Sequence, residues 1–224
     1  MAAGAVAVYT INAHHRSGLL AAAMARGIKA CGDTPHLLAE HAYRSPVAPV
    51  CVFYGLAGRT PQIFEDYRRT GTAVYVDLGY WGRHAGGRWT GYHKCVINAR
   101  HPTAYFQARP RPADRFGVFG LQFEPWRRDR DAGAHVLVAG MGDKAAACEG
   151  FAPEEWERGA IDALRAATPR PIVYRPKPSW RGARPMTGAG YSSPTTPLAA
   201  ALDNCWAVVT HHSNVGVDAL LAGV

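Results

Sequence analysis

Short apolar runs alternate along the chain with segments whose apolar residues recur at helical spacing. Continuous apolar runs predict buried strands, and they fall at residues 5–11, 50–54, 72–78, 135–139, 171–175 and 206–210. Apolar residues three and four positions apart predict helices, and such spacing occurs at residues 19–29, 61–69, 153–167, 198–202 and 214–221. Strands that alternate with helices predict parallel sheets.

An irregular stretch interrupts this alternation in the middle of the chain. Residues 99–133 are rich in arginine, proline and phenylalanine and show no apolar period. We therefore expect an α/β protein made of two Rossmann-like halves with parallel sheets. The expected halves are residues 1–125 and residues 126–224.

Composition changes this picture in one respect, which is charge. The chain of 224 residues has 25 Lys+Arg and 17 Asp+Glu, a net charge of +8, and 21 of the cations are arginines. Such an excess suits an acidic partner such as nucleic acid, a nucleotide phosphate or an anionic polymer, although GC-rich coding explains an arginine excess equally well. Because 48% of the residues are hydrophobic and 19% are charged, a disordered chain is excluded.

No segment of the sequence indicates export or membrane insertion. A transmembrane helix needs about 18 apolar residues in a row, and the first ten residues lack the cationic start of a secretory signal. None of the five cysteines forms a Cys-x-x-Cys pair, so we expect free thiols in a reducing compartment. We therefore expect a cytoplasmic protein, in the host cytoplasm if a phage encodes it, with no membrane span.

Polar or glycine-rich residues follow several predicted strands. Ligands of open parallel sheets bind at the carboxyl ends of the strands, and three such ends lie in the second half: Gly140–Asp143, Arg175–Lys177 and Thr210–Asn214. Ser213 is expected to cap the last helix and to leave backbone N–H groups for an anion. The cations of the second segment add charge, so the three segments together predict a phosphate site.

Two segments of the second half resemble a known family. Residues 172–178, Ile-Val-Tyr-Arg-Pro-Lys-Pro, are similar to the strand, basic residue and Pro-His-Pro segment of capsule-polysaccharide glycosyltransferases of the Kdo-transferase type. Residues 208–223, Val-Val-Thr-His-His-Ser-Asn-Val-Gly-Val-Asp-Ala-Leu-Leu-Ala-Gly, are similar to their Val-Thr-x-x-Ser-x-x-x-x-(Glu/Asp)-Ala-Leu-x-x-Gly segment. The resemblance covers about residues 135–224 and implies a compact GT-B-like fold whose second half binds a nucleotide sugar.

The resemblance implies a glycosyltransferase without a cofactor, whose co-substrate is a donor such as a UDP- or CMP-sugar. Lys177 replaces the histidine of the family, which retains a phosphate contact but not an imidazole. The sequence stops at Val224, where the family continues with a proline, a strand and a closing helix, so it is either truncated or a minimal version of the fold. The donor-binding residues so implied are Gly140, Gly142, Arg175, Lys177, Thr210, His211, His212, Ser213, Asn214 and Asp218.

Metal dependence is not expected. The sequence Asp129-Arg130-Asp131 has Asp-x-Asp spacing, but it lies in the irregular arginine-rich stretch between the two expected halves, and we do not expect a metal-dependent GT-A enzyme. The adjacent His211 and His212 are expected to point apart, because neighbouring residues rarely face the same way.

Inverting glycosyl transfer needs a general base on the acceptor hydroxyl and stabilisation of the leaving diphosphate. The candidate bases follow strands of the first half: Asp77 after the third strand, and His14 or His15 after the first. The alternative is that the histidines are surface loop residues and that Asp77 is a turn residue.

Residues 80–111 interleave cations with aromatic residues and glycines and contain no carboxylate. Such a segment suits a phosphate backbone with stacked or flipped bases, so we expect a DNA acceptor, a hydroxymethylated base of phage-type DNA. The same cations would also suit an anionic surface polysaccharide or a lipid-linked acceptor. The alternative to an enzyme is a non-catalytic nucleic-acid-binding α/β protein. The acceptor-binding candidates are Arg83, Arg88, Trp89, His93, Lys94, Arg100 and Arg109.

Overall fold

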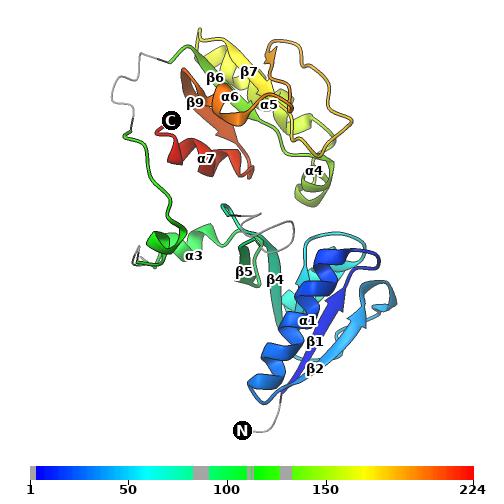
Figure 1. Ribbon diagram of the computed structural model, residues 1–224. Helices are drawn as coiled ribbons and strands as arrows, with labels where there is room; N and C mark the ends of the chain where they lie inside the picture. The colour runs from blue at the N-terminus through cyan, green and yellow to red at the C-terminus, as the bar shows by residue number, and fades with distance from the viewer. Residues whose placement is uncertain (1–3, 83–90, 110–111, 113, 127–132) are drawn as a thin grey trace. The chain divides into compact units, whose positions relative to one another are not determined.

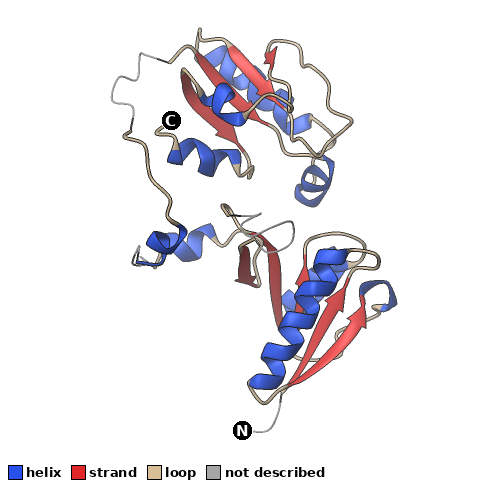
Figure 2. Ribbon diagram, viewed as in Figure 1, coloured by secondary structure: helices blue, strands red, loops and turns tan. Residues whose placement is uncertain are grey.

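The computed structural model of the chain describes residues 4–82, 91–109, 112, 114–126 and 133–224. The chain divides into two compact units, Met1–Asp114 and Arg115–Val224, and each is described by itself. Each unit is a mixed α/β structure around a sheet whose strands are mainly parallel (Figure 2). The predicted fold class, an α/β chain with two parallel-sheet halves, is confirmed.

The second unit starts earlier in the sequence than the composition predicts. The expected boundary between residues 125 and 126 falls inside it, because the segment before that point packs on the last helix, α7 (Val215–Leu221). The N–H of Glu124 donates to the carbonyl of Leu221 at 2.8 Å. The carbonyl of Pro125 lies so close to Gly223 that a side chain there would collide with it.

The sheet of the first unit has five strands in the order β2-β1-β3-β4-β5 (Figure 1). They are β1 (Ala5–Thr10), β2 (Thr34–Ala39), β3 (Val50–Tyr54), β4 (Thr72–Leu78) and β5 (His93–Ile97). The first four are parallel, and β5 pairs antiparallel with β4. The apolar pattern does not predict β2, because this edge strand is largely exposed and tolerates Pro35.

Helices cover both faces of this sheet. The helix α1 (His15–Ala30) packs on the face that contains Val52, and α2 (Thr60–Thr70) packs on the face that contains Phe53. Successive strand residues point to opposite faces, so the continuous apolar run of β3 serves both layers. The remaining short helices are η1 (Glu40–Ala42), α3 (Thr103–Gln107) and η2 (Asp114–Phe119).

The sheet of the second unit has four parallel strands in the order β8-β7-β6-β9. They are β6 (His135–Ala139), β7 (Ile172–Arg175), β8 (Gly190–Tyr191) and β9 (Cys205–Thr210). Its helices are α4 (Asp143–Glu149), α5 (Glu155–Ala167), α6 (Leu198–Leu202) and α7. The two elements that the sequence does not predict are α4, which is alanine-rich without an apolar period, and β8, which is only two residues long.

Each sheet reverses its strand order at one point. The strand β1 lies between β2 and β3, and β6 lies between β7 and β9. Ligands of open parallel sheets bind at the carboxyl ends of the strands at such points. The segments after β1 and β3, and those after β6 and β9, are therefore the places where the fold favours a site.

Two further expectations concern the whole chain. All five cysteines are free thiols, and Cys51 and Cys205 are buried whereas Cys31 and Cys95 are exposed. Among the described residues, no helix combines the length and the apolar character that crossing a membrane requires.

Candidate functional site

A cluster of polar and aromatic side chains occupies the carboxyl edge of the first sheet. The Tyr54 ring centroid at the end of β3 lies 5.4 Å from that of His14 and 5.9 Å from that of His93. Nη1 of Arg16 donates to the Tyr54 hydroxyl at 2.9 Å. These residues come from the loop after β1, the first turn of α1, the end of β3 and the start of β5, so the topology brings together positions far apart in the sequence.

His14 starts the helix α1. Its Nδ1 accepts the N–H of Ser17 at 3.2 Å, and the helix therefore begins at His15, earlier than the apolar spacing predicts. His14 is therefore the N-cap of α1, while His15 is exposed at the first helical position.

Asp77 lies near the carboxyl end of β4 with both carboxylate oxygens hydrogen-bonded. Its Oδ2 accepts the Tyr75 hydroxyl at 2.6 Å, and its Oδ1 accepts the N–H of Leu78 at 2.8 Å. Burial raises the pKa of Tyr75 and of Tyr80, and the charge of Asp77 raises both further. Asp77 is thus a half-buried carboxyl group whose orientation is fixed by two hydrogen bonds.

Lys94 belongs to the same part of the edge as Asp77. The two are register partners across the antiparallel pair of β4 and β5. The Lys94 ammonium lies 5.6 Å from the ring centroid of Tyr75 and 5.5 Å from that of Tyr80, and it donates to the carbonyl of Arg100 at 3.4 Å. Burial lowers the pKa of Lys94 and the charge of Asp77 opposes this shift, so Lys94 is a cation among aromatic rings.

Of the other acceptor-binding candidates, Arg100 lies beside this cluster, because its carbonyl accepts Lys94 and its charge opposes the rise in the pKa of Tyr75. Nη1 of Arg109 donates to the Tyr105 hydroxyl at 3.2 Å, and its guanidinium carbon is 4.6 Å from the centroid of that ring. Both side chains are exposed at the end of α3. The candidates outside the described residues are Arg83, Arg88 and Trp89.

Three of the predicted donor segments meet at the carboxyl edge of the second sheet. They follow β7, β6 and β9, which are neighbours in the sheet. The N–H of Gly140 donates to the Arg175 carbonyl at 2.9 Å, and Gly142 has a φ of 138°, which favours glycine. A Cβ on Gly142 would lie 3.1 Å from Cδ of the exposed Lys177, so the glycine turn and the lysine are in contact.

Arg175 has a structural role in this part of the molecule. It is only 6% exposed, and its guanidinium donates to the Ser192 hydroxyl at 3.0 Å and to the carbonyls of Ser193 at 2.9 Å and Thr196 at 2.7 Å. These bonds direct the guanidinium toward the loop between β8 and α6, whereas the sequence suggested a donor phosphate as its partner. Burial lowers the pKa of Arg175, as expected for a cation removed from water.

The turn after β9 differs from the predicted helix cap. Oγ1 of Thr210 accepts the N–H of Ser213 at 3.0 Å and closes the turn. The helix α7 has Asn214 as its N-cap, and the Asn214 side chain makes no capping hydrogen bond. The expectation that Ser213 caps the helix is therefore wrong; its hydroxyl accepts the N–H of Val215 only at 3.4 Å.

His211 and His212 face each other, contrary to the expectation that they point apart. Their Nδ1 atoms are 2.7 Å apart, and the His211 ring meets Phe151 and Trp156 edge-on, each at 5.8 Å between centroids. Two imidazole nitrogens on one tetrahedral zinc ion, each at about 2.0–2.1 Å, would be roughly 3.3 Å apart, so the shorter distance fits a shared proton. In the described part of the chain, no three His, Cys, Asp or Glu residues are grouped to hold a metal ion.

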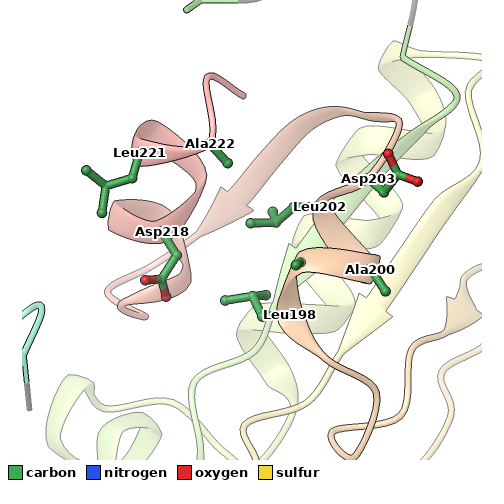
Figure 3. A pocket seen from close by; sticks show the side chains of 8 residues that line it. Leu198, Ala200, Leu202, Asp203, Asp218, Leu221 and Ala222 are labelled. Carbon is green, nitrogen blue, oxygen red and sulfur yellow. The ribbon is translucent and has the colours of Figure 1, made fainter. Parts of the chain in front are cut away.

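Asp218, the last predicted donor residue, lines a pocket between α6 and α7 (Figure 3). The pocket has a volume of about 680 Å³. Apart from Asp203 and Asp218 its lining is apolar: Leu198, Ala199, Ala200, Leu202, Leu221 and Ala222. Asp218 is thus associated with this pocket on one face of the sheet.

The sequence prediction missed three side chains that the structure places at the two sheet edges: Arg16, Tyr54 and Glu157. Tyr54 is the last residue of a predicted strand, which is a detectable signal. Arg16 follows the two loop histidines and was not distinguished from a surface cation. Glu157 shares one helix face with Ile161, four residues on, which indicates an inward-facing acid.

Comparisons with known proteins give a distant structural likeness. No protein-family model matches the chain, and no curated protein does. Among solved structures, it is similar to Thermosulfurimonas dismutans KpsC, a beta Kdo 2,4 transferase, with 11% identity and a TM-score of 0.49 over 96% of this chain and 76% of that chain.

Proposed function

We propose that the chain is a glycosyltransferase that uses a nucleotide sugar and that its second unit binds the donor. The observation that carries the proposal is the placement of Gly140–Gly142, Lys177 and His211–Ser213 at the ends of adjacent parallel strands. The last two of these belong to the segments that resemble the glycosyltransferase family. Glycine-turn N–H groups, a lysine ammonium and imidazole rings are suitable donors for a diphosphate.

In the proposed reaction the acceptor hydroxyl attacks the anomeric carbon of the donor sugar. The hydroxyl proton goes to the Asp77 carboxylate, and a bond forms between the acceptor oxygen and the anomeric carbon. The bond from that carbon to the phosphate oxygen breaks, and the nucleotide leaves with the electron pair. Asp77 suits the role of base because Tyr75 and the N–H of Leu78 fix its orientation.

We propose DNA with a hydroxymethylated base as the acceptor. The support is the carboxylate-free segment 80–111, in which Lys94 and Arg109 lie over tyrosine rings. Phosphates of a DNA strand attract such cations, and the hydroxymethyl group supplies the nucleophilic oxygen. The acceptor assignment depends on this segment alone and is separate from the assignment of the donor site.

Mass spectrometry of DNA tests donor and acceptor together. Duplex DNA with 5-hydroxymethylcytosine is incubated with the full chain and a panel of UDP- and CMP-sugars, beside the same duplex with unmodified cytosine. We expect a mass gain of one sugar on the hydroxymethylated duplex only. A mass gain on an anionic polysaccharide instead would identify the polysaccharide, and not DNA, as the acceptor. Salt-dependent DNA binding without nucleotide binding would favour a non-catalytic DNA-binding protein.

Thermal unfolding tests the donor site without an acceptor. UDP or CMP at about 100 times its dissociation constant would add about 2.7 kcal/mol to the free energy of unfolding, a readily measured shift. Lys177→Ala and Ser213→Ala should remove the shift, and Lys29→Ala, which changes an exposed lysine of the first unit, should keep it. If no nucleotide or nucleotide sugar raises the melting temperature of the wild-type chain, the proposal is overturned.

A further inference from the structure

Two buried oxygen atoms beneath the glycine turn have no hydrogen-bond partner. Glu157, in the first turn of α5, is 1% exposed, and Tyr174, on β7, is 0% exposed. Oε1 of Glu157 accepts the N–H of Met141 at 2.8 Å, whereas its Oε2 and the Tyr174 hydroxyl are buried and unpartnered. Buried polar groups are nearly always paired, so this exception needs a physical explanation.

The side chains of Glu157 and Tyr174 both lie next to the same residue of the turn, Gly140. A Cβ on Gly140 would lie 3.1 Å from Oε1 of Glu157 and 3.2 Å from the Tyr174 hydroxyl oxygen. Burial raises the pKa of Tyr174, and the charge of Glu157 raises it further, as expected for neighbours in a dry environment. The glycine turn therefore lies directly on a pair of buried oxygens.

The other acids at the start of α5 serve a different purpose. Glu155 is exposed, and its Oε2 accepts the N–H of Ala152 at 2.7 Å; Glu154 pairs with Arg158 at 3.4 Å. Glu157 makes the same kind of bond as Glu155, one carboxylate oxygen to one backbone N–H, but inside the protein. Burying a carboxylate is costly unless it is paired, so a merely structural hydrogen bond is a poor reason for its position.

We propose that Glu157 and Tyr174 are positioning residues for the donor site, which hold the Gly140–Gly142 turn so that the N–H of Gly142, whose two neighbours along the turn already donate to Arg175 and Glu157, meets a phosphate of a nucleotide. The inference rests on the proposed function, because it assumes that this turn binds the donor. Glu157 fixes the turn through the N–H of Met141. The Tyr174 hydroxyl, unpartnered in the free protein, donates to Oε2 of Glu157 when an anion engages the turn, so the missing hydrogen bond forms on binding.

This assignment predicts opposite signs for two measurements on Tyr174→Phe. The substitution removes an unpartnered buried hydroxyl, so the free protein should unfold at a higher temperature. It also removes the hydrogen bond of the bound state, so UDP or CMP should bind several-fold more weakly. A hydroxyl with a merely structural role, for instance one bridged by a buried water, would give the other pattern: a lower melting temperature and unchanged affinity.

Titration calorimetry on the full chain with UDP and CMP provides the test. Glu157→Ala should raise the dissociation constant about tenfold, because it removes the hydrogen bond that holds the N–H of Met141, and misplacing a site by about 1 Å can cost about 10²-fold. Glu157→Gln keeps a carbonyl oxygen for Met141 and should restore most of the affinity. The matched controls are Glu155→Ala, which removes the exposed bond of the same type, and Tyr191→Phe, on the neighbouring strand, and both should bind as the wild type does.

The outcomes separate this inference from the proposed function. If the wild-type chain binds no nucleotide, the proposed function fails and this inference fails with it. If the wild type binds but folded Glu157→Ala and Tyr174→Phe bind equally well, only the positioning role is overturned. Circular dichroism and the melting temperature of each variant show whether it is folded before its affinity is interpreted.

Discussion

The carboxyl edges of the two sheets each include a point where the strand order reverses, but the chemistry of the two edges differs. At the first edge, ionisable side chains surround Asp77: Tyr54, Tyr75, Tyr80 and Lys94 have pKa values that burial shifts and that its charge affects. At the second edge, the central feature is the backbone of the Gly140–Gly142 turn, with Lys177 against it. An edge of coupled titrating groups suits proton transfer, whereas an edge of glycine N–H groups suits anion binding.

The hydrophobic cores behind the two edges also differ, because the first contains more buried hydroxyl groups than the second. Four tyrosines are buried on the α2 face of the first sheet, where the hydroxyls of Tyr9 and Tyr67 are 3.3 Å apart and Tyr43 donates to Asp66 at 2.9 Å. The second core is mainly aliphatic around Leu137 and Val138. Burial raises the pKa of Tyr9 and Tyr43, so more of the stability of the first unit depends on protonation.

The largest expected effect comes from removing the charge at the first edge. Asp77→Asn keeps the size of the side chain but cannot accept the acceptor proton, so we expect a rate 10²–10⁴ times lower, about the usual contribution of a general base. Nucleotide affinity should stay within about twofold, because the proposed donor-binding residues belong to the other unit. Steady-state kinetics and calorimetry on the same preparation measure both, and an unchanged rate would exclude Asp77 as the base.

Arg175 tests whether a cation at the second edge binds the ligand or supports the fold. Replacing it with methionine removes three hydrogen bonds to the 192–196 loop, and we expect the free energy of unfolding to fall by roughly 3 kcal/mol, since hydrogen bonds to charged groups are worth about 1.5–3 kcal/mol. Urea unfolding without ligand measures this loss. Full stability combined with lost nucleotide affinity would instead restore Arg175 to the donor-binding residues.

The sequence predicts strands well where both faces of a strand are buried. Residues 50–54 and 135–139 are continuous apolar runs and match β3 and β6 residue for residue. The exposed edge strand β2 has no such run, because its stability comes from backbone pairing with β1 and not from its side chains. Strand ends were predictable for the same reason, and with them the positions of Asp77 and Lys177.

Side-chain partners at those strand ends could not be predicted in this way. Arg175 and Lys177 look alike in the sequence, but one is buried against a loop and the other is exposed beside Gly142. The difference arises because Arg175 is the last residue of β7 whereas Lys177 lies beyond the strand, and because the 192–196 loop supplies carbonyls to Arg175 from a distant part of the chain. Likewise, the cap at His14 depends on a hydrogen bond that no residue pattern specifies.

The glycine turn of the second edge should be sensitive to a single methyl group. Gly142→Ala adds a Cβ at a φ of 138°, 3.1 Å from Cδ of Lys177, and we expect a loss of roughly 1–3 kcal/mol from backbone strain together with weaker nucleotide binding. Gly159→Ala is the matched control, since this helical glycine has no atom within 4 Å of an added Cβ. That variant should be more stable than the wild type by about 0.5–1 kcal/mol; equal effects at both glycines would contradict the assigned conformation.

The smallest expected effect concerns the dependence of the first unit on alkaline pH. Burial raises the pKa of the Cys51 thiol from 9.0 to about 12, so the folded protein keeps a proton that the unfolded chain releases. The stabilisation from this group is complete below pH 9 and is lost as the pH rises toward 12. Between pH 9 and 10, Cys51 should account for about 1 kcal/mol of the loss in unfolding free energy.

Urea titrations under reducing conditions should therefore show that the unfolding free energy of Cys51→Ala declines less steeply with pH than that of the wild type, whatever its stability at neutral pH. Cys31→Ala, at an exposed thiol, should keep the wild-type slope, and parallel slopes for all three proteins would show that the folded state does not hold the proton of Cys51.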